Sequence, residues 1–218
     1  MNNFIKILSI IHREGWKFSV ISLLISIFLA TTVPLLSFFG FLIIFFILWF
    51  FRDPDRNTPN EERKIISPAD GKVCLIDSST PPKELNYGNE KMLRVCIFMN
   101  VFNVHVNRSP VRGKIKKIEY KEGSFFNASL DKASEKNERN SVIITTESGI
   151  EIIVVQIAGL IARRILSFVN DGDRLNLGER FGLIRFGSRV DVYLPKTFKS
   201  EVKVGDKTIA GETIIGSY

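Results

Sequence analysis

Histidine and cysteine are both scarce in this 218-residue chain, which holds two of each. The histidines, His12 and His105, are far apart in sequence, and Cys74 and Cys96 form no CxxC pair. The spacing therefore offers neither the ligand set of a metal site nor a disulfide framework. Both cysteines lie in apolar, strand-like stretches, which predicts small buried side chains in a reducing compartment.

Charge is missing from one long stretch, since no charged residue occurs from Phe18 to Phe51. A single straight helix of that length would extend about 50 Å, whereas the hydrocarbon core of a bilayer is about 30 Å thick. Pro34 stands near the middle and proline breaks helices, so we expect two apolar helices, roughly at residues 18–32 and 35–51. Each is short for a full crossing, which favours a re-entrant or shallow hairpin. A cleaved signal peptide is the alternative, but the run is longer than the apolar region of such peptides.

Basic residues flank this apolar run on both sides. Lys6, Arg13 and Lys17 precede it, and Arg52 and Arg56 follow it. Positive charge at both ends predicts that both face the cytoplasm. The formal net charge of +7 favours an anionic partner, and no dense block of basic residues with interleaved aromatics occurs. We therefore expect lipid headgroups rather than nucleic acid, and a location at the cytoplasmic face of the cell (inner) membrane.

Three segments follow one another along the chain. Residues 1–51 would hold a short interfacial helix and the membrane hairpin, residues 52–64 a polar linker, and residues 65–218 a strand-rich domain. Apolar runs rich in β-branched residues predict strands near 73–76, 93–99, 115–120, 142–146, 150–157, 183–186, 190–194 and 202–204. A short helix is expected only at Leu160–Leu166.

The expected fold is mainly β (α+β), a compact antiparallel β domain preceded by the helical hairpin. Glycine turns separate short strands in the tail, residues 202–216, as they do in lipoyl and biotinyl carrier barrels. Lys207 is the one lysine there that corresponds to a carrier lysine, and its neighbours do not match the carrier motif. The likeness therefore concerns the shape of a barrel and not its function.

Three residues match the roles of a nucleophile, a base and an orienting carboxylate: Ser188, His105 and Asp70. Asp70 lies in a turn before an apolar strand, and Ser188 stands between two strand-like runs. His105 alternates with Asn103 and Asn107, which predicts one shared strand face. Each residue alone is ordinary, and chain order does not show that the three meet.

Six motifs then occur in order along the chain. They are WFFRDP at 49–54, SPADGKV at 67–73, FMNVFNVHVNR at 98–108, NERN at 137–140, QIAGLIARRI at 156–165 and GLIRFGSRVD at 182–191. Together they resemble the short (prokaryotic) form of the phosphatidylserine decarboxylase proenzymes, from about Trp49 to the C-terminus.

The resemblance implies that the proenzyme cuts its own Gly187–Ser188 bond. Asp70 would orient His105, and His105 would take the proton from Ser188 Oγ. The hydroxyl would attack the carbonyl of Gly187, which has no Cβ and so tolerates a tight geometry. The products would be a β chain of residues 1–187 and an α chain of residues 188–218 that remain associated.

The resemblance also implies the cofactor and the substrate. Ser188 would become a covalent pyruvoyl group, which forms a Schiff base with membrane phosphatidylserine and releases CO2 and phosphatidylethanolamine. A homodimer is implied by the resemblance alone. The alternatives are a decarboxylase of an ether-linked (archaetidyl) serine lipid, and a non-catalytic, membrane-anchored β-barrel binding module.

Two positions depart from the pattern of longer family members. Many of these carry a second histidine where this chain has Phe102, so the proton donor in decarboxylation stays open between His105 and a water molecule. The cleavage site reads Phe-Gly-Ser-Arg in place of Leu-Gly-Ser-Thr. Arg189 is thus either a ligand of the substrate carboxylate or phosphate, or a solvated strand residue.

Four further residues are candidates for substrate binding. Arg163 and Arg164 would contact the lipid phosphodiester, because guanidinium groups match phosphate oxygens. Phe125 and Phe126 lie in a long polar stretch, residues 123–140, and would dip into the bilayer interface near the site.

Overall fold

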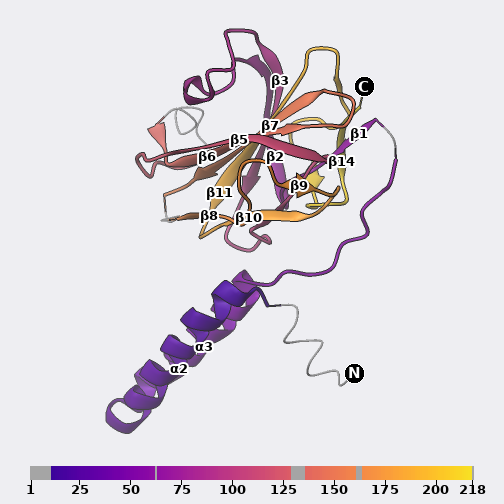
Figure 1. Cartoon of the computed structure of the whole chain (residues 1–218). Helices are drawn as coiled ribbons and strands as arrows, with labels where there is room; N and C mark the ends of the chain where they lie inside the picture. Colours follow the sequence, from indigo (N-terminus) through magenta and orange to yellow (C-terminus); the bar gives the residue numbers. More distant parts are fainter. Residues whose placement is uncertain (1–10, 62, 129–135, 161–163, 218) are drawn as a thin grey trace. The chain divides into compact units, whose positions relative to one another are not determined.

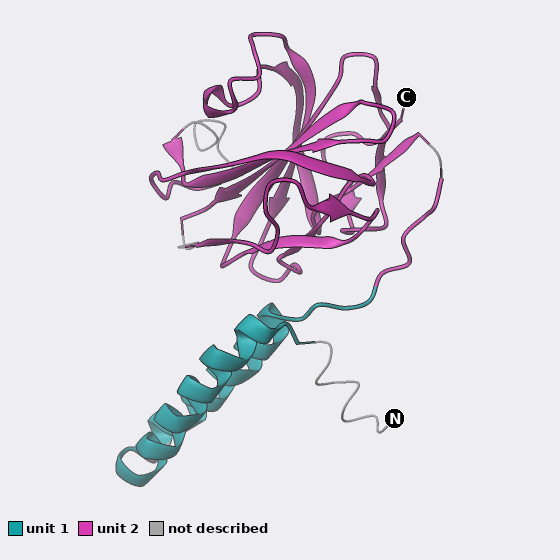
Figure 2. Ribbon diagram, in the orientation of Figure 1, with its two compact units in different colours: residues 1–55 teal, residues 56–218 magenta. Residues whose placement is uncertain are grey.

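The computed structural model of the chain describes residues 11–61, 63–128, 136–160 and 164–217. The chain divides into two compact units, Met1–Asp55 and Arg56–Tyr218 (Figure 2). The segment predicted as a linker, residues 52–64, is therefore shared between them. Each unit is described by itself.

The first unit is a helical hairpin formed by α2 (Arg13–Thr32) and α3 (Pro34–Phe50). Only Val33 separates the helices, and a proline at the first position of α3 fits because that position needs no N–H donor. Helix α2 starts earlier than predicted because His12 caps it, with Nδ1 accepting a hydrogen bond from the Glu14 N–H at 3.3 Å. His12 thus has a structural task at the start of a helix.

The two helices pack closely where Gly40 of α3 meets Ser26 of α2. A Cβ at position 40 would overlap the Ser26 hydroxyl, so the glycine permits the close approach. The outward-facing side chains are apolar and exposed, among them Leu24, Phe28, Leu35 and Phe45. Helix α2 is long and apolar enough to cross a membrane, whereas α3 is shorter.

The second unit contains an eight-stranded antiparallel sheet that curls strongly upon itself (Figure 1). Its strands, in spatial order, are β13 (Lys207–Thr208), β2 (Gly71–Ser79), β3 (Met92–Met99), β11 (Ser188–Leu194), β7 (Glu151–Ala158), β6 (Arg139–Thr145), β5 (Gly113–Lys121) and β9 (Arg174–Leu175). The prediction of a mainly β, antiparallel domain behind two N-terminal helices is confirmed.

Two three-stranded sheets and a short helix complete this unit. One sheet has the order β4 (Val106–Arg108), β10 (Arg180–Ile184), β8 (Ile165–Ser167), and the other has the order β1 (Lys64–Ile66), β14 (Ile214–Ser217), β12 (Lys199–Ser200). The 3-10 helix η1 (Lys83–Leu85) lies between β2 and β3.

Two local predictions were wrong. The stretch 202–204 forms no strand, and the end of the expected helix Leu160–Leu166 belongs to strand β8, while residues 161–163 lie outside the described part of the chain.

Both faces of the large sheet are buried. The inner face holds the main core, which includes Ile97, Val154, Phe181 and Val192. A smaller cluster covers the other face, where Leu85 and Met92 pack with Tyr193 of β11. Strand β11 is therefore buried on both sides, and all its residues from Ser188 to Leu194 have little exposed surface.

Strand pairing brings His105, the predicted base, close to the segment that ends at Ser188, the predicted nucleophile. Strand β10 pairs with β4 so that Leu183 faces Val106, and the Ile184 N–H donates to the His105 carbonyl at 3.2 Å. Only the residues 185–187 separate β10 from β11. His105, which directly precedes β4, is thus fixed beside the short connection that ends at Ser188.

Candidate active site

Ser188 is the first residue of β11 and is held in the sheet from both sides. It pairs with Met99 at the end of β3 and with Ala158 at the end of β7. Its side chain is fully buried, and Oγ lies 3.6 Å from Met99 Sδ, to which it donates a weak hydrogen bond. In this arrangement the hydroxyl points at a sulfur atom.

The residue pair before Ser188 adopts an unusual backbone conformation. Phe186 has φ 59° and Gly187 has φ 69°, both in the left-handed region. Such a conformation costs a residue with a Cβ on the order of 1 kcal/mol or more, so Phe186 is strained beside the predicted cleavage bond. Gly187 is free of that cost because it lacks a Cβ. The strain is one feature of the site that the sequence pattern did not reveal.

His105 contacts the backbone N–H of Gly187, the residue that precedes the predicted cleavage bond. Its buried imidazole accepts a hydrogen bond at Nε2 from the Gly187 N–H, with 3.2 Å between the nitrogens. A backbone N–H only donates, so Nε2 carries no proton here. The proton is therefore on Nδ1, which donates to the Asn103 carbonyl at 2.9 Å. The arrangement leaves an unprotonated ring nitrogen at the Gly187 N–H.

Asn103 holds its carbonyl in place through a tight turn. Its N–H donates to the Asn100 carbonyl at 3.0 Å, and its side-chain oxygen accepts from the Asn100 N–H at 2.9 Å. Asn103 therefore lies in a turn and not on a strand face with His105 and Asn107, as the alternating pattern had predicted. It orients the imidazole through its main chain.

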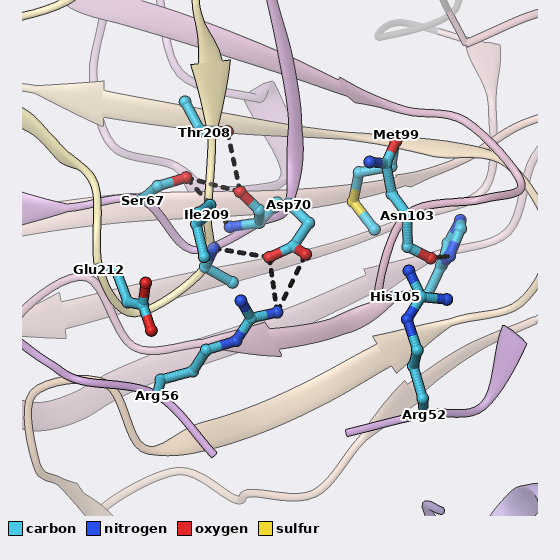
Figure 3. A network of polar contacts seen from close by, with 12 residues as sticks. Arg52, Arg56, Ser67, Asp70, Met99, Asn103, His105, Thr208, Ile209 and Glu212 are labelled. Atoms are coloured by element: carbon cyan, nitrogen blue, oxygen red, sulfur yellow. Dashed lines mark hydrogen bonds and ion pairs between the residues drawn. The ribbon is translucent and has the colours of Figure 1, made fainter. Parts of the chain in front are cut away.

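Asp70 is bound elsewhere in this arrangement. Its carboxylate accepts two hydrogen bonds from Arg56 Nη2, at 3.0 and 2.9 Å, and one from the Ala210 N–H at 2.7 Å. Figure 3 shows the carboxylate directed at Arg56, with His105 and Asn103 apart from this cluster. No hydrogen bond between Asp70 and His105 is formed in the described structure, so the predicted triad is not assembled as such.

Arg189 is buried inside the sheet, which corrects both roles considered for it. Its guanidinium donates to both carboxylate oxygens of Asp191, at 2.6 and 2.8 Å, and to Cys96 Sγ at 3.1 Å. Burial would lower the pKa of Arg189, but the Asp191 charge outweighs it and raises that pKa. With 1% of its surface exposed, Arg189 is neither solvated nor able to contact a substrate.

This ion pair fixes the start of β11, and its loss should destabilise the fold. Replacing Arg189 with methionine leaves Asp191 buried with only the more distant Arg94, 3.8 Å away. We expect the free energy of unfolding to fall by about 3–5 kcal/mol. Denaturant unfolding in the uncut Ser188→Ala background measures it, with Arg174→Met as an exposed control. Equal stability of the two variants would show that the buried pair contributes nothing.

The prediction that both cysteines are buried is confirmed for Cys96 and only partly for Cys74. Cys96 is fully buried, whereas Cys74 is half-buried, and both are free thiols. Cys74 Sγ donates to the Cys96 carbonyl at 3.4 Å. Burial raises the pKa of both thiols, and Asp191 adds to this effect at each site. Neither cysteine is therefore poised as a nucleophile.

The remaining candidates for substrate binding lie on the surface or outside the described residues. Arg163 belongs to the undescribed stretch 161–163, while Arg164 is exposed. Phe125 and Phe126 are partly exposed, and Asn137 holds their segment through two hydrogen bonds with the Phe126 backbone.

A cavity of about 260 Å³ adjoins Gly187 and thus the predicted cleavage bond. Phe186 and Gly187 line one side, and Gly159 and Leu160, which follow β7, line another. Asn100 and Asn127 also line the cavity, and Phe98, Val101 and Ala128 complete a mostly apolar wall. A mostly apolar lining of this kind is typical of small-ligand sites.

Phe102, which replaces a histidine of longer family members, is exposed near this site at 65% of its surface. It has no group that transfers protons. No group of three or more metal-ligating side chains is found among the described residues either.

A buried chain of amides behind Ser188 escaped the sequence analysis. Met99 Sδ, which faces Ser188, also lies 3.8 Å from Asn107 Nδ2, and Gln156 Nε2 donates to Asn107 Oδ1 at 2.7 Å. Asn140 Nδ2 then donates to Gln156 Oε1 at 2.9 Å. The signal was a glutamine within an apolar strand, since a buried polar side chain needs partners.

Comparison with known proteins adds two findings. The family model described as phosphatidylserine decarboxylase matches residues 43–216. A protein of Azorhizobium caulinodans named phosphatidylserine decarboxylase proenzyme is 54% identical over 211 residues, which cover 95% of this chain and 89% of that protein.

Proposed function

Because this chain belongs to the phosphatidylserine decarboxylase family, we propose that it is a membrane-associated, self-processing decarboxylase that converts phosphatidylserine to phosphatidylethanolamine and CO2. One observation carries the proposal. The hydrogen bond between His105 Nε2 and the Gly187 N–H puts an unprotonated ring nitrogen at the residue whose carbonyl would be attacked. Ser188 supplies a hydroxyl at the same bond.

Self-cleavage would begin with a rotation of the Ser188 hydroxyl from Met99 toward the Gly187 carbonyl carbon. His105 Nε2 takes the hydroxyl proton as Oγ bonds to that carbon. The peptide C–N bond then breaks and the proton passes to the Ser188 nitrogen, which leaves an ester between the two residues. Loss of the Cα proton of residue 188 to a base and of Gly187 as a carboxylate then leaves a dehydroalanine at position 188. Addition of water and loss of ammonia convert it to a pyruvoyl group.

The surroundings of position 188 fit a pyruvoyl group. Residues 189–193 pair with β3 and β7, so position 188 would stay at the end of a strand held from both sides after its nitrogen and the bond to Gly187 are lost. Pairing of the rest of β11 between β3 and β7 would keep the α chain with the β chain. The group supplies an electron-withdrawing carbonyl for the loss of CO2 from an amino acid headgroup. The 260 Å³ cavity beside Gly187 gives that headgroup a place.

Lipid access rests on three features. The apolar hairpin, α2 and α3, would anchor the protein at the cytoplasmic face of the inner membrane, and the net charge of +7 suits an anionic bilayer. Asn127, which lines the cavity, directly follows Phe125 and Phe126. These phenylalanines would therefore enter the interface next to the headgroup site. Arg164 is exposed and available to a lipid phosphate.

An assay of the purified protein tests the proposed activity. In detergent micelles that contain phosphatidylserine, the wild-type protein should release CO2 and form phosphatidylethanolamine. Phenylhydrazine, which reacts with ketones, should abolish this activity, and Ser188→Ala should show none. Ester- and ether-linked substrates in parallel decide between the two lipid classes. A correctly cut protein that is inactive on both would refute the decarboxylase assignment.

A further inference from the structure

Gly159 lies directly opposite Gly187 where strands β7 and β11 meet. Ala158 pairs with Ser188, and because the strands are antiparallel the next pair in register is Gly159 with Gly187. Gly159 is buried and lines the cavity at the cleavage bond. The carbonyl that Ser188 must attack therefore faces a residue without a side chain.

Steric fit, and not backbone conformation, explains a glycine at this position. Gly159 is absent from the glycines with positive φ, so its backbone suits any residue. A Cβ at position 159 would overlap the Gly187 carbonyl oxygen and lie 3.1 Å from the Gly187 carbonyl carbon. Gly187 is the reverse case, because its φ is 69° but an added Cβ would meet only Val101 Cγ1 at 4.0 Å. The two glycines thus serve different purposes.

The attack requires space for this oxygen. As Ser188 Oγ bonds to the Gly187 carbon, the π-electron pair moves onto the carbonyl oxygen, and the hydroxyl proton goes to His105 Nε2. The carbon changes from planar to tetrahedral, so the oxygen leaves the peptide plane while it carries negative charge. The C–N bond then breaks, the proton passes to the Ser188 nitrogen, and the carbonyl forms again. The oxygen needs room during this movement.

We propose that Gly159 is a positioning residue for self-cleavage, because its missing side chain leaves the recess that the Gly187 carbonyl oxygen occupies during attack. The inference rests on the proposed function and adds a residue to its first step. A methyl group in the recess would displace the carbonyl from the path of Oγ. Misplacement by about 1 Å typically costs on the order of 100-fold in rate.

The test is Gly159→Ala, with Gly113→Ala as a matched control. Gly113 lies on β5, has no positive φ, and an added Cβ there would crowd the backbone of Thr145, 3.0 Å from its carbonyl carbon. Both variants therefore force two strands apart, but only one does so at the cleavage bond. Freshly made protein is followed over time by intact mass. We expect cleavage of Gly159→Ala to slow about 100-fold or more, and Gly113→Ala to be cut like wild type.

Neutral hydroxylamine shows whether the block lies before or after the attack. It cuts esters, so a chain that stalls after the attack yields fragments on treatment, whereas Gly159→Ala should yield none because no ester forms. Should Gly159→Ala fail to fold, Gly159→Ala with Ala128→Gly removes a Cβ that lies 3.3 Å from the added methyl group. Cleavage of that folded double variant should also be about 100-fold or more slower than in wild type.

The results of these experiments distinguish a failure of the proposed function from a failure of the role proposed for Gly159. A wild-type chain that is never cut between Gly187 and Ser188 would refute the proposed function itself. A wild-type chain that is cut, together with a folded Gly159→Ala chain that is cut at the same rate or releases fragments with hydroxylamine, would overturn the role of Gly159 alone.

Discussion

Replacing Ser188 with alanine should leave one uncut chain close to 24.8 kDa, in place of two chains. Alanine removes the only atom that attacks the Gly187 carbonyl, and a pyruvoyl group cannot form without the hydroxyl. The loss should therefore be complete for both cleavage and decarboxylation. The variant should still fold, since the Ser188 hydroxyl makes only a weak contact with Met99 at 3.6 Å.

A denaturing gel and intact mass measure this result. Ser167→Ala is a suitable control, because Ser167 is an exposed serine on β8 and should leave processing unchanged. Cleavage of Ser188→Ala at the same bond would show that another group attacks Gly187. It would remove the chemical basis of the proposed mechanism.

Replacing His105 with alanine should slow self-cleavage by about 10²–10⁴-fold, the usual contribution of a positioned general base. The structure gives this ring one task at each nitrogen: Nδ1 donates to Asn103, and Nε2 faces Gly187. Without the imidazole, the ring nitrogen that would take the Ser188 proton is missing. Time courses of intact mass at fixed pH measure the rate.

Two comparisons distinguish a role of His105 as the general base from a role in packing. His105→Gln fills much of the space and can still accept from the Gly187 N–H, but it takes up no proton, so it should be as slow as His105→Ala. Added imidazole should partly restore cleavage of His105→Ala, because the vacated space matches its shape. Normal cleavage of folded His105→Gln would exclude His105 as the base.

The largest features could be predicted from the sequence, because each depends on a local pattern of residues. Charge is absent from Phe18 to Phe51, and only a membrane or a large core accommodates such a run. Strand runs with alternating or continuous apolar residues located β3, β7 and β11 closely. Ser188 and His105 were found from motifs, and their proximity then followed from the pairing of β4 with β10.

Other features depend on contacts that no local pattern encodes. Asp70 was paired with His105 on chain order, but its carboxylate binds Arg56 from the segment predicted as a linker and the backbone of Ala210. Arg189 was considered as an exposed residue, because a charged side chain in a half-buried strand normally points to solvent. Here the second face of the sheet is covered by Leu85 and its neighbours, so that Arg189 and Asp191 are enclosed together.

The turn at Asn103 shows a related limit. Alternation along residues 103–107 predicted one continuous strand, whereas hydrogen bonds between Asn103 and Asn100 close a turn and only Val106 onward pairs in β4. Asparagine side chains that bond to nearby backbone compete with strand pairing. That competition turned the Asn103 carbonyl toward His105 and gave the ring its orientation.

The central claim is that the Gly187–Ser188 bond is cut and that Ser188 becomes a pyruvoyl group. The most direct measurement is the intact mass of the small chain from purified wild-type protein. It should correspond to residues 188–218 and be lighter by one ammonia than the same chain with an N-terminal serine. Edman degradation should find it blocked. A single uncut chain, or a small chain that begins with an ordinary serine, would contradict the claim.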